Sequence, residues 1–307
     1  SRARSPQPRQ GWRRRRLRGG ACRRSIGRML LVTWNIQWGR GADGRVDLAR
    51  IARELRRVAG GDADVICLQE VSDGHDRLPG CDGSDQFAEL AALLPRFEPV
   101  AGIATDTRPR DGAPRKRFGN LLLSRWPVRQ ALRHLLPWPA EDGVRSMQRV
   151  AVEATLDTPL GLLRVTTTHL EYYSAPQRAA QVERLRELQR EAAAHARTQR
   201  PGSAAEGAFE PVPRVAPAVL AGDFNCRPGD PALARLLEPI DAATPAYRDA
   251  WAIAHPDRPH EATVGRYDKA QWPGEPFTFD FILVTEDLAR RVRDARVDAA
   301  SDASDHQ

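Results

Sequence analysis

The chain has 307 residues, of which 41% are hydrophobic and 28% charged, a composition typical of a soluble globular protein with one large domain or two small ones. The formal charge of +7 arises in residues 1–28, which hold eleven Arg and no acid, and the remainder has 36 basic and 40 acidic residues. The basic pI is therefore no argument for a nucleic-acid surface on the folded part, and no apolar run reaches the ~18 residues of a membrane helix.

The N-terminal segment and the cysteines bear on targeting and on the cellular compartment of the protein. Residues 1–28 lack the apolar stretch of a signal peptide and are either a basic, disordered nucleic-acid or targeting arm, or non-native upstream sequence before a start at Met29. The missing initiator Met favours the second alternative. Four cysteines without paired spacing indicate neither a disulfide framework nor a zinc site. We expect a monomer in the reducing cytoplasm.

The first predicted elements are a strand over 29–35 that ends in Asn35, a glycine-rich turn, and a helix over 46–58 with apolar residues at helical spacing. A buried strand follows over 64–70 and finishes on Glu70. A carboxylate there must be solvated, paired or bound to a metal, and a solvated edge residue is the simpler alternative.

The middle of the chain predicts a short helix over 84–94, an exposed loop over 107–117 and a strand over 118–124. Four basic residues of that loop either meet an anionic substrate or are merely solvated: Arg108, Arg110, Arg115 and Lys116. Alternating residues over 149–156 and 162–168 predict a hairpin whose second strand ends at His169. A helix capped by Ser174 should run to about Ala196, followed by a flexible linker over 198–214.

An apolar run over 215–221 predicts a buried strand that ends at Gly222 and presents Asp223 and Asn225. Residues two apart in a strand point to the same side, so this carboxylate and this amide should face one point. The alternative is a strand followed by an Asx-type turn, because Asp, Asn, Gly and Pro all favour turns.

The last part of the chain predicts a short helix over 247–251, a strand over 277–284 with Asp280 inside it, and a final strand over 291–297. A buried Asp280 needs a partner. The chain then stops on a polar segment with Asp305 and His306, so we expect that a closing C-terminal strand is missing.

Eight polar residues lie at, beyond or inside these strands, where ligands commonly bind. They are Asn35, Glu70, His169, Asp223, Asn225, Asp280, Asp305 and His306. The set is rich in oxygen, contains two His and lacks Cys, which suits Mg²⁺ or Mn²⁺ better than structural zinc. A metal, an acid to act on water and two imidazoles around an anion describe the hydrolysis of a phosphoester.

These residues stand in short motifs whose order resembles the endonuclease/exonuclease/phosphatase superfamily, the DNase I-like group that includes AP endonucleases, neutral sphingomyelinases and inositol-phosphate 5-phosphatases. The motifs are Trp34-Asn35, Leu68-Gln69-Glu70, Thr168-His169-Leu170, Gly222-Asp223-Phe224-Asn225, Phe279-Asp280-Phe281-Ile282 and Ser304-Asp305-His306. The resemblance covers residues 29–307, taken as one catalytic domain. It implies a four-layer α/β sandwich, with two mainly antiparallel β-sheets packed face to face and flanked by helices.

The resemblance also implies roles for the candidate residues. Glu70 would be the main Mg²⁺ ligand, Asn35 would shape the metal and phosphate side, and Asp305 would contact a second metal or its waters. Asp223 would orient or deprotonate the attacking water. Asn225, His169 and His306 would bind the phosphate, and Asp280 would hold His306 in its orientation.

Three functions follow as alternatives. The first is an endonuclease or general phosphodiesterase, and the second is a phospholipid or inositol-phosphate hydrolase. The third is a non-catalytic binding domain, which the completeness of the site disfavours. His169 and Gln37 depart from the pattern of AP endonucleases, and Thr278-Phe279 precedes Asp280 where many members of the superfamily have a basic residue first, so AP-site repair is disfavoured. The expected partner is a phosphoester substrate, with nucleic acid as one possibility.

Overall fold

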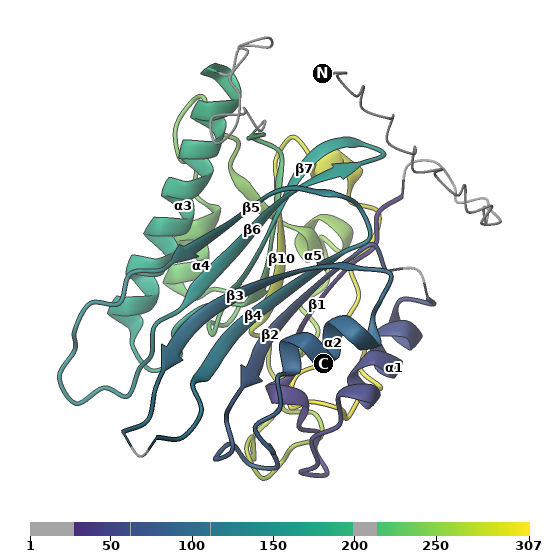
Figure 1. The fold of residues 1–307 in the computed structure, drawn as a ribbon. Helices are drawn as coiled ribbons and strands as arrows, with labels where there is room; N and C mark the ends of the chain where they lie inside the picture. Colours follow the sequence, from purple (N-terminus) through teal and green to yellow (C-terminus); the bar gives the residue numbers. More distant parts are fainter. Residues whose placement is uncertain (1–27, 62, 111, 199–213) are drawn as a thin grey trace, which may run out of the picture.

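Two β-sheets face each other in the computed structural model of the protein, which describes residues 28–61, 63–110, 112–198 and 214–307 (Figure 1). The first sheet has the order β1-β2-β4-β3 and is made of Leu31–Asn35, Val65–Asp73, Lys116–Ser124 and Glu98–Thr107. The second has the order β5-β6-β7-β8-β10-β9 and is made of Val128–Leu135, Val150–Thr158, Gly161–His169, Ala218–Asp223, Asp280–Thr285 and Tyr247–Asp249. Each sheet has one parallel pair, β1-β2 and β7-β8, and is otherwise antiparallel.

Helices cover the outer faces of both sheets, α1 and α2 on the first and α3 and α4 on the second (Figure 1). Their bounds are α1 Leu48–Val58, α2 Gln86–Leu93, α3 Ala175–Thr198, α4 Pro231–Leu237 and α5 Ala250–Ala254, with short 3₁₀ turns η1 Gln37–Gly39 and η3 Ala289–Arg291. Helices α1, α2 and α4 begin after Asp47, Asp85 and Asp230, whose side chains accept a hydrogen bond from a backbone N–H of the first turn.

The alternation of side chains along each strand builds the four layers. In β2, Ile66 and Leu68 pack with the α1 and α2 side chains, whereas Val65 and Cys67 point into the core between the sheets. In β8, Leu220 packs with α3 and α4, while Val219 joins the same inter-sheet core. The expected four-layer α/β sandwich is therefore confirmed.

Several boundaries differ from the sequence predictions. Strands β3 and β5 and helix α4 were not predicted, and β2 runs past Glu70 to Asp73 after an irregularity in its pairing with β4 between Leu68 and Val71. The predicted helix over 247–251 is a three-residue strand that leads into α5. The predicted strand over 291–297 is wrong, because after η3 this segment pairs with no described strand. Asp280 opens β10 and does not lie inside a strand.

Other predictions fall where little is described. The N-terminal extension lies outside the described residues apart from Arg28, and the linker over 198–214 lies outside them apart from Thr198 and Arg214. Among the described residues, no helix combines the length and apolarity needed to cross a membrane.

Candidate active site

Strand register in the second sheet places Asp223 between two other candidate residues. Asp223 ends β8 and lies opposite His169 at the end of β7 and opposite Asp280 at the start of β10. The Nε2 atom of His169 lies 3.4 Å from Oδ2 of Asp223. Gly222 has a φ of +150°, and a Cβ there would lie 1.9 Å from the carbonyl oxygen of Thr168, so this close approach requires glycine.

The first sheet contributes Asn35 and Glu70 from across the inter-sheet space. The Nδ2 atom of Asn35 donates to Oδ2 of Asp223 at 3.0 Å and to Oε1 of Glu70 at 3.1 Å, while its Oδ1 accepts from the backbone N–H of Gln37. Glu70 has a φ of +59°, a strained value for a non-glycine residue that turns its carboxylate toward the site. Its expected role as a metal ligand and that of Asn35 stay predictions, since Asn35 turns Nδ2 and not Oδ1 toward the carboxylates.

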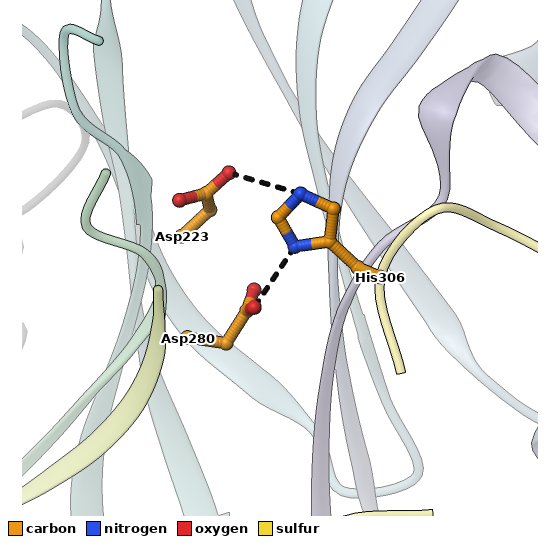
Figure 2. Close-up of side chains that lie close together, drawn as sticks. All are labelled: Asp223, Asp280 and His306. Carbon is orange, nitrogen blue, oxygen red and sulfur yellow. Dashed lines mark hydrogen bonds and ion pairs between the residues drawn. The ribbon is translucent and has the colours of Figure 1, made fainter. Parts of the chain in front are cut away.

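His306 completes the group from the end of the chain (Figure 2). Its Nδ1 lies 2.8 Å from Oδ2 of Asp280, and its Nε2 lies 3.7 Å from Oδ2 of Asp223. The indole N–H of Trp34 donates to the carbonyl of His306, and the hydroxyl of Ser304 donates to the carbonyl of Asn35. These two bonds fix the C-terminal segment against β1, so that the imidazole stands between two carboxylates.

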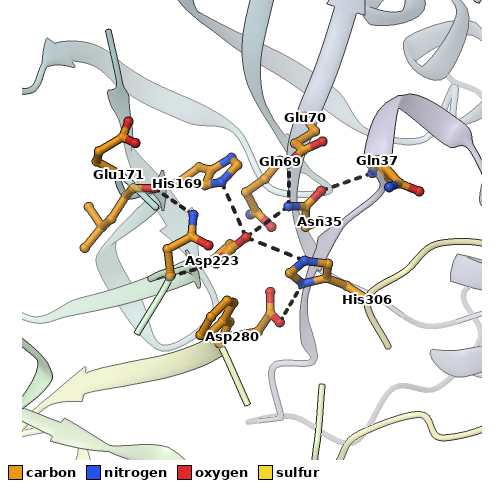
Figure 3. Close-up of polar contacts among 12 residues, drawn as sticks. Asn35, Gln37, Gln69, Glu70, His169, Glu171, Asp223, Asp280 and His306 are labelled. Atoms are coloured by element: carbon orange, nitrogen blue, oxygen red, sulfur yellow. Dashed lines mark hydrogen bonds and ion pairs between the residues drawn. The ribbon is translucent and has the colours of Figure 1, made fainter. Parts of the chain in front are cut away.

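Asp223 is the point at which these contacts meet. Figure 3 shows its carboxylate with contacts to His169, Asn35 and His306, and only 1% of the residue is exposed. Its other oxygen, Oδ1, accepts from the backbone N–H of Asn225, which has a φ of +49°. The Asx-type turn is therefore formed, and the Asn225 side chain donates to the carbonyl of Leu170. Strand β8 ends at Asp223, so the alternation of a strand does not extend to Asn225, and the contact between the two residues is that of the Asn225 backbone N–H with the carboxylate.

Asp305 lies at the border of this group. Its Oδ2 accepts hydrogen bonds from the Gln271 amide and the Trp272 indole, both at 2.9 Å, and Oδ1 lies 3.3 Å from the Ser304 hydroxyl. Within the described part of the chain, the hydrogen bonds of Asp305 go to Gln271, Trp272 and Ser304 and not to the Asp223 carboxylate, so its expected contact with a second metal stays a prediction.

Burial and neighbouring charges shift the pKa values of the site residues in different directions. Burial, together with the charge of Asp305, raises the pKa of Glu70 to about 7, and burial raises the pKa of Asp223 to about 6 against the opposing charge of His306. Burial, with the nearby Arg149, holds the pKa of His169 well below its usual range. Burial opposes charge on His306 too, but Asp280, Asp305 and Asp223 outweigh it and raise its pKa well above the usual range. One imidazole is thus kept neutral and the other cationic.

The donor set fits a metal ion. The buried side chains of Asp223, Asp280 and His306 offer ligand atoms that all lie within 4.8 Å of one another, which is the spacing of a possible metal site. Glu70 adds a partly exposed carboxylate whose pKa is raised first by burial and then by the charges of Asp305 and Asp223, and a bound cation would relieve the repulsion among these carboxylates. Oxygen ligands in this number favour a hard divalent cation.

Sequence reasoning missed Thr263, which helps to hold the site in place. The Thr263 hydroxyl donates to Oδ2 of Asp280 at 2.6 Å and accepts from the backbone N–H groups of Phe279 and Asp280. The buried pair of Arg149 and Glu171, 3.1 Å apart, lies beside His169. A Thr in a loop carries no signal in the sequence, whereas an acid two residues after the His169 strand end was visible.

The basic loop over 107–117 is largely neutralised by acids. Arg115 pairs with Asp106 at 2.7 Å and Lys116 pairs with Asp76 at 2.5 Å, and both contacts are solvent-exposed. This supports the solvated alternative for those two residues.

Comparisons with known proteins agree with this geometry. The model of the Endonuclease/Exonuclease/phosphatase family matches residues 32–306. A structure of an endonuclease/exonuclease/phosphatase from Beutenbergia cavernae is 27% identical, with a TM-score of 0.53 over 90% of this chain and 68% of that one.

Two further structures are similar at the level of the fold. One from Bacteroides vulgatus, of the same description, is 17% identical, with a TM-score of 0.58 over 90% of this chain and 94% of that one. The 3' phosphatase NExo from Neisseria, solved with a product DNA hairpin, is 18% identical, with a TM-score of 0.54 over 91% of this chain and 96% of that one. No curated protein matches the chain in sequence. The family match spans every candidate residue, and the chain belongs to the endonuclease/exonuclease/phosphatase family of phosphoester hydrolases.

Proposed function

We propose that the protein is a Mg²⁺- or Mn²⁺-dependent phosphodiesterase that cleaves nucleic acid or a related phosphodiester. The observation that supports this most is the convergence of His169, His306 and Asn35 on one carboxylate oxygen of Asp223. A base for water and groups that bind an anion then lie within 3.7 Å of one oxygen, which is the arrangement that phosphoester hydrolysis requires.

The residues divide the work as follows. Asp223 orients a water and accepts its proton as the oxygen attacks phosphorus, and the bond from phosphorus to the leaving oxygen breaks. The cationic His306 and the neutral His169 donate to phosphoryl oxygens and stabilise the charge that develops there. Asp280 accepts the Nδ1 proton of His306, which fixes the orientation of the ring. Glu70 with neighbouring carboxylates would hold a divalent cation, which would supply Lewis-acid polarisation of the phosphoryl group.

The test uses the full chain with supercoiled plasmid, a single-stranded oligonucleotide, methyl p-nitrophenyl phosphate and a phosphomonoester, each with Mg²⁺ and with EDTA. We expect metal-dependent cleavage that Asp223→Asn lowers by about 10²–10⁴-fold, the usual contribution of a positioned base. Asp241→Asn, at an exposed turn that touches none of the site residues, is the matched control.

The substrates separate the alternatives. Turnover of the monoester alone would move the activity to a phosphatase, and turnover of a phospholipid or inositol phosphate alone would favour the second hypothesis. Equal rates in wild type and Asp223→Asn would refute the assigned base. A chain with no metal-dependent turnover of any of these substrates would instead support a binding domain of the same fold.

A further inference from the structure

Two tyrosines stand exposed immediately beside the candidate active site. Tyr172 and Tyr173 follow His169 in the turn between β7 and α3, and 39% and 58% of them are exposed. The other exposed large hydrophobic residues of the described chain belong to other segments: Val58, Leu135, Trp138, Leu160 and Tyr267. Exposed aromatic side chains next to a reactive centre commonly mark a contact surface.

The turn that carries the tyrosines is held firmly. The buried carboxylate of Glu171 accepts from the backbone N–H of Tyr173 at 2.9 Å and from Nε of Arg149 at 3.1 Å. From α3, Nη1 of Arg178 donates to the carbonyls of Glu171 and Tyr172 at 2.9 and 3.1 Å. Three hydrogen bonds thus fix the backbone of the turn and a fourth fixes the Glu171 side chain, so the exposure of the two rings is built into the fold.

Tyr172 connects the turn to the site through a cluster of rings. It meets Tyr173 edge-on at 4.8 Å between ring centroids, and it meets Trp272 and Phe279 at 6.1 Å each. The indole N–H of Trp272 donates to Asp305, and Phe279 directly precedes Asp280. The aromatic cluster therefore lies directly beside the carboxylates of the candidate site. Tyr173 contacts Tyr172 alone among the rings of the described residues, which leaves most of its surface open.

We propose that Tyr173, supported by Tyr172, is a stacking platform for an unpaired nucleobase of the substrate strand. The inference rests on the proposed function and narrows its substrate to single-stranded or frayed nucleic acid. A rigid ring with an open face binds a base at little cost in conformational entropy, and every base offers a π-face. Bases inside a duplex are already stacked on both sides, so they cannot use it.

The chemistry of the patch favours a base over a lipid. The exposed side chains of the cluster are tyrosines with polar hydroxyls, and the guanidinium of the exposed Arg227 lies 4.7 Å from the centroid of the Phe277 ring, at the edge of the same cluster. A cation at this edge suits the phosphates of a strand. Among the described residues, no exposed large aliphatic side chain comes from the 171–174 turn, as insertion between acyl chains would need.

The first experiment measures binding without cleavage. A fluorescein-labelled oligo(dT) is titrated in EDTA with wild type, Tyr173→Ala and Tyr173→Trp, and its anisotropy gives the dissociation constant. We expect Tyr173→Ala to weaken binding about 5- to 150-fold, the effect of losing one base–aromatic stack, and Tyr173→Trp to retain it. Tyr267→Ala is the matched control, because Tyr267 is 44% exposed and makes no ring contact within the described chain.

The second experiment changes the oligonucleotide and not only the protein. An oligonucleotide with abasic sites keeps the phosphates but removes the rings, so Tyr173→Ala should bind it as wild type does. An equal loss on both oligonucleotides, or no loss on either, would overturn the stacking platform. If Tyr173→Ala loses binding to phosphatidylcholine vesicles but not to the oligonucleotide, the patch binds a lipid and the proposal is overturned as well. Neither binding measurement needs turnover. The stacking platform can therefore be refuted while the hydrolase activity is confirmed, and the activity can be refuted while the stacking platform is confirmed.

Discussion

The charge buried beneath α3 gives the most quantitative prediction. Glu153 of β6 is 2% exposed and lies 3.1 Å from Nη1 of Arg164, 3.2 Å from Nε of Arg214 and 3.5 Å from Nε2 of His134. Burial alone would raise the pKa of Glu153, but the contacts with His134, Arg164 and Arg214 lower it to about 2. The drop in the pKa from the usual value of 4.5 corresponds to about 3 kcal/mol of folding stability.

The sign of this contribution follows from the lowered pKa. The unfolded chain binds the proton more readily, so the stabilisation is fully present above about pH 4.5 and is lost as the pH falls toward 2. Glu153→Gln keeps the shape but removes the counter-charge of Arg164 and leaves Arg214 paired with Glu191. We expect it to lower the free energy of unfolding by about 3–5 kcal/mol at neutral pH, as removing one partner of a buried pair does.

Urea denaturation followed by circular dichroism from pH 3 to pH 8 checks this expectation. The difference between wild type and Glu153→Gln should shrink steadily below about pH 4.5. Glu238→Gln serves as the control, because Glu238 is 54% exposed and pairs with Arg235 at the surface, where such pairs contribute little. A difference that stays constant with pH, or a variant as stable as wild type at pH 7, would refute the reasoning.

Three further predictions concern the site itself. Asp280→Asn removes one of the charges that raise the pKa of His306, so the basic limb of the kcat profile should move to lower pH; an unmoved limb would show that another group titrates there. Thr263→Val removes the hydroxyl donor to Asp280 and should lower kcat about 10–100-fold, whereas Thr263→Ser keeps it; equal rates for the two variants would contradict this role. Mg²⁺ should raise the Tm more at pH 8 than at pH 6, because the pKa of Glu70 is about 7 and the ion binds the ionised carboxylate. In Glu70→Gln the extra rise in Tm at pH 8 should disappear. If that extra rise persists, Glu70 is not a ligand of the metal.

Central strands could be predicted from the sequence, as could the edge strand β1, whereas the edge strands β3 and β5 could not. The continuous apolar runs over 64–70 and 215–221 belong to β2 and β8, which have neighbours on both sides and layers on both faces. Strands β3 and β5 stand at sheet edges with half-exposed side chains, so they lack the apolar alternation that identifies a buried strand. The segment 291–297 shows the converse error, since β-branched residues without a partner strand do not form one.

The polar ends of strands could be predicted, but not what holds them. Asp223, His169 and Asn35 are readable because a buried apolar run stops at each of them. Thr263 acts on Asp280 from 17 residues away in a loop, and this partnership exists only through tertiary packing. The start of α4 at the Asp230-Pro231 pair was not predicted, although Asp caps helices and Pro suits their first position.

Three amides cross the space between the sheets. Asn35 reaches Asp223, Gln69 reaches the Thr167 hydroxyl at 2.9 Å, and Asn120 reaches the carbonyl of Val150 at 3.0 Å. Each sheet carries half of the candidate site, and these bonds make the two halves move as one rigid body. Shape changes that accommodate a substrate are therefore left to the turns and loops around the mouth. Mutations deep in the inter-sheet core would then act on turnover by misaligning the halves, well before they unfold the protein.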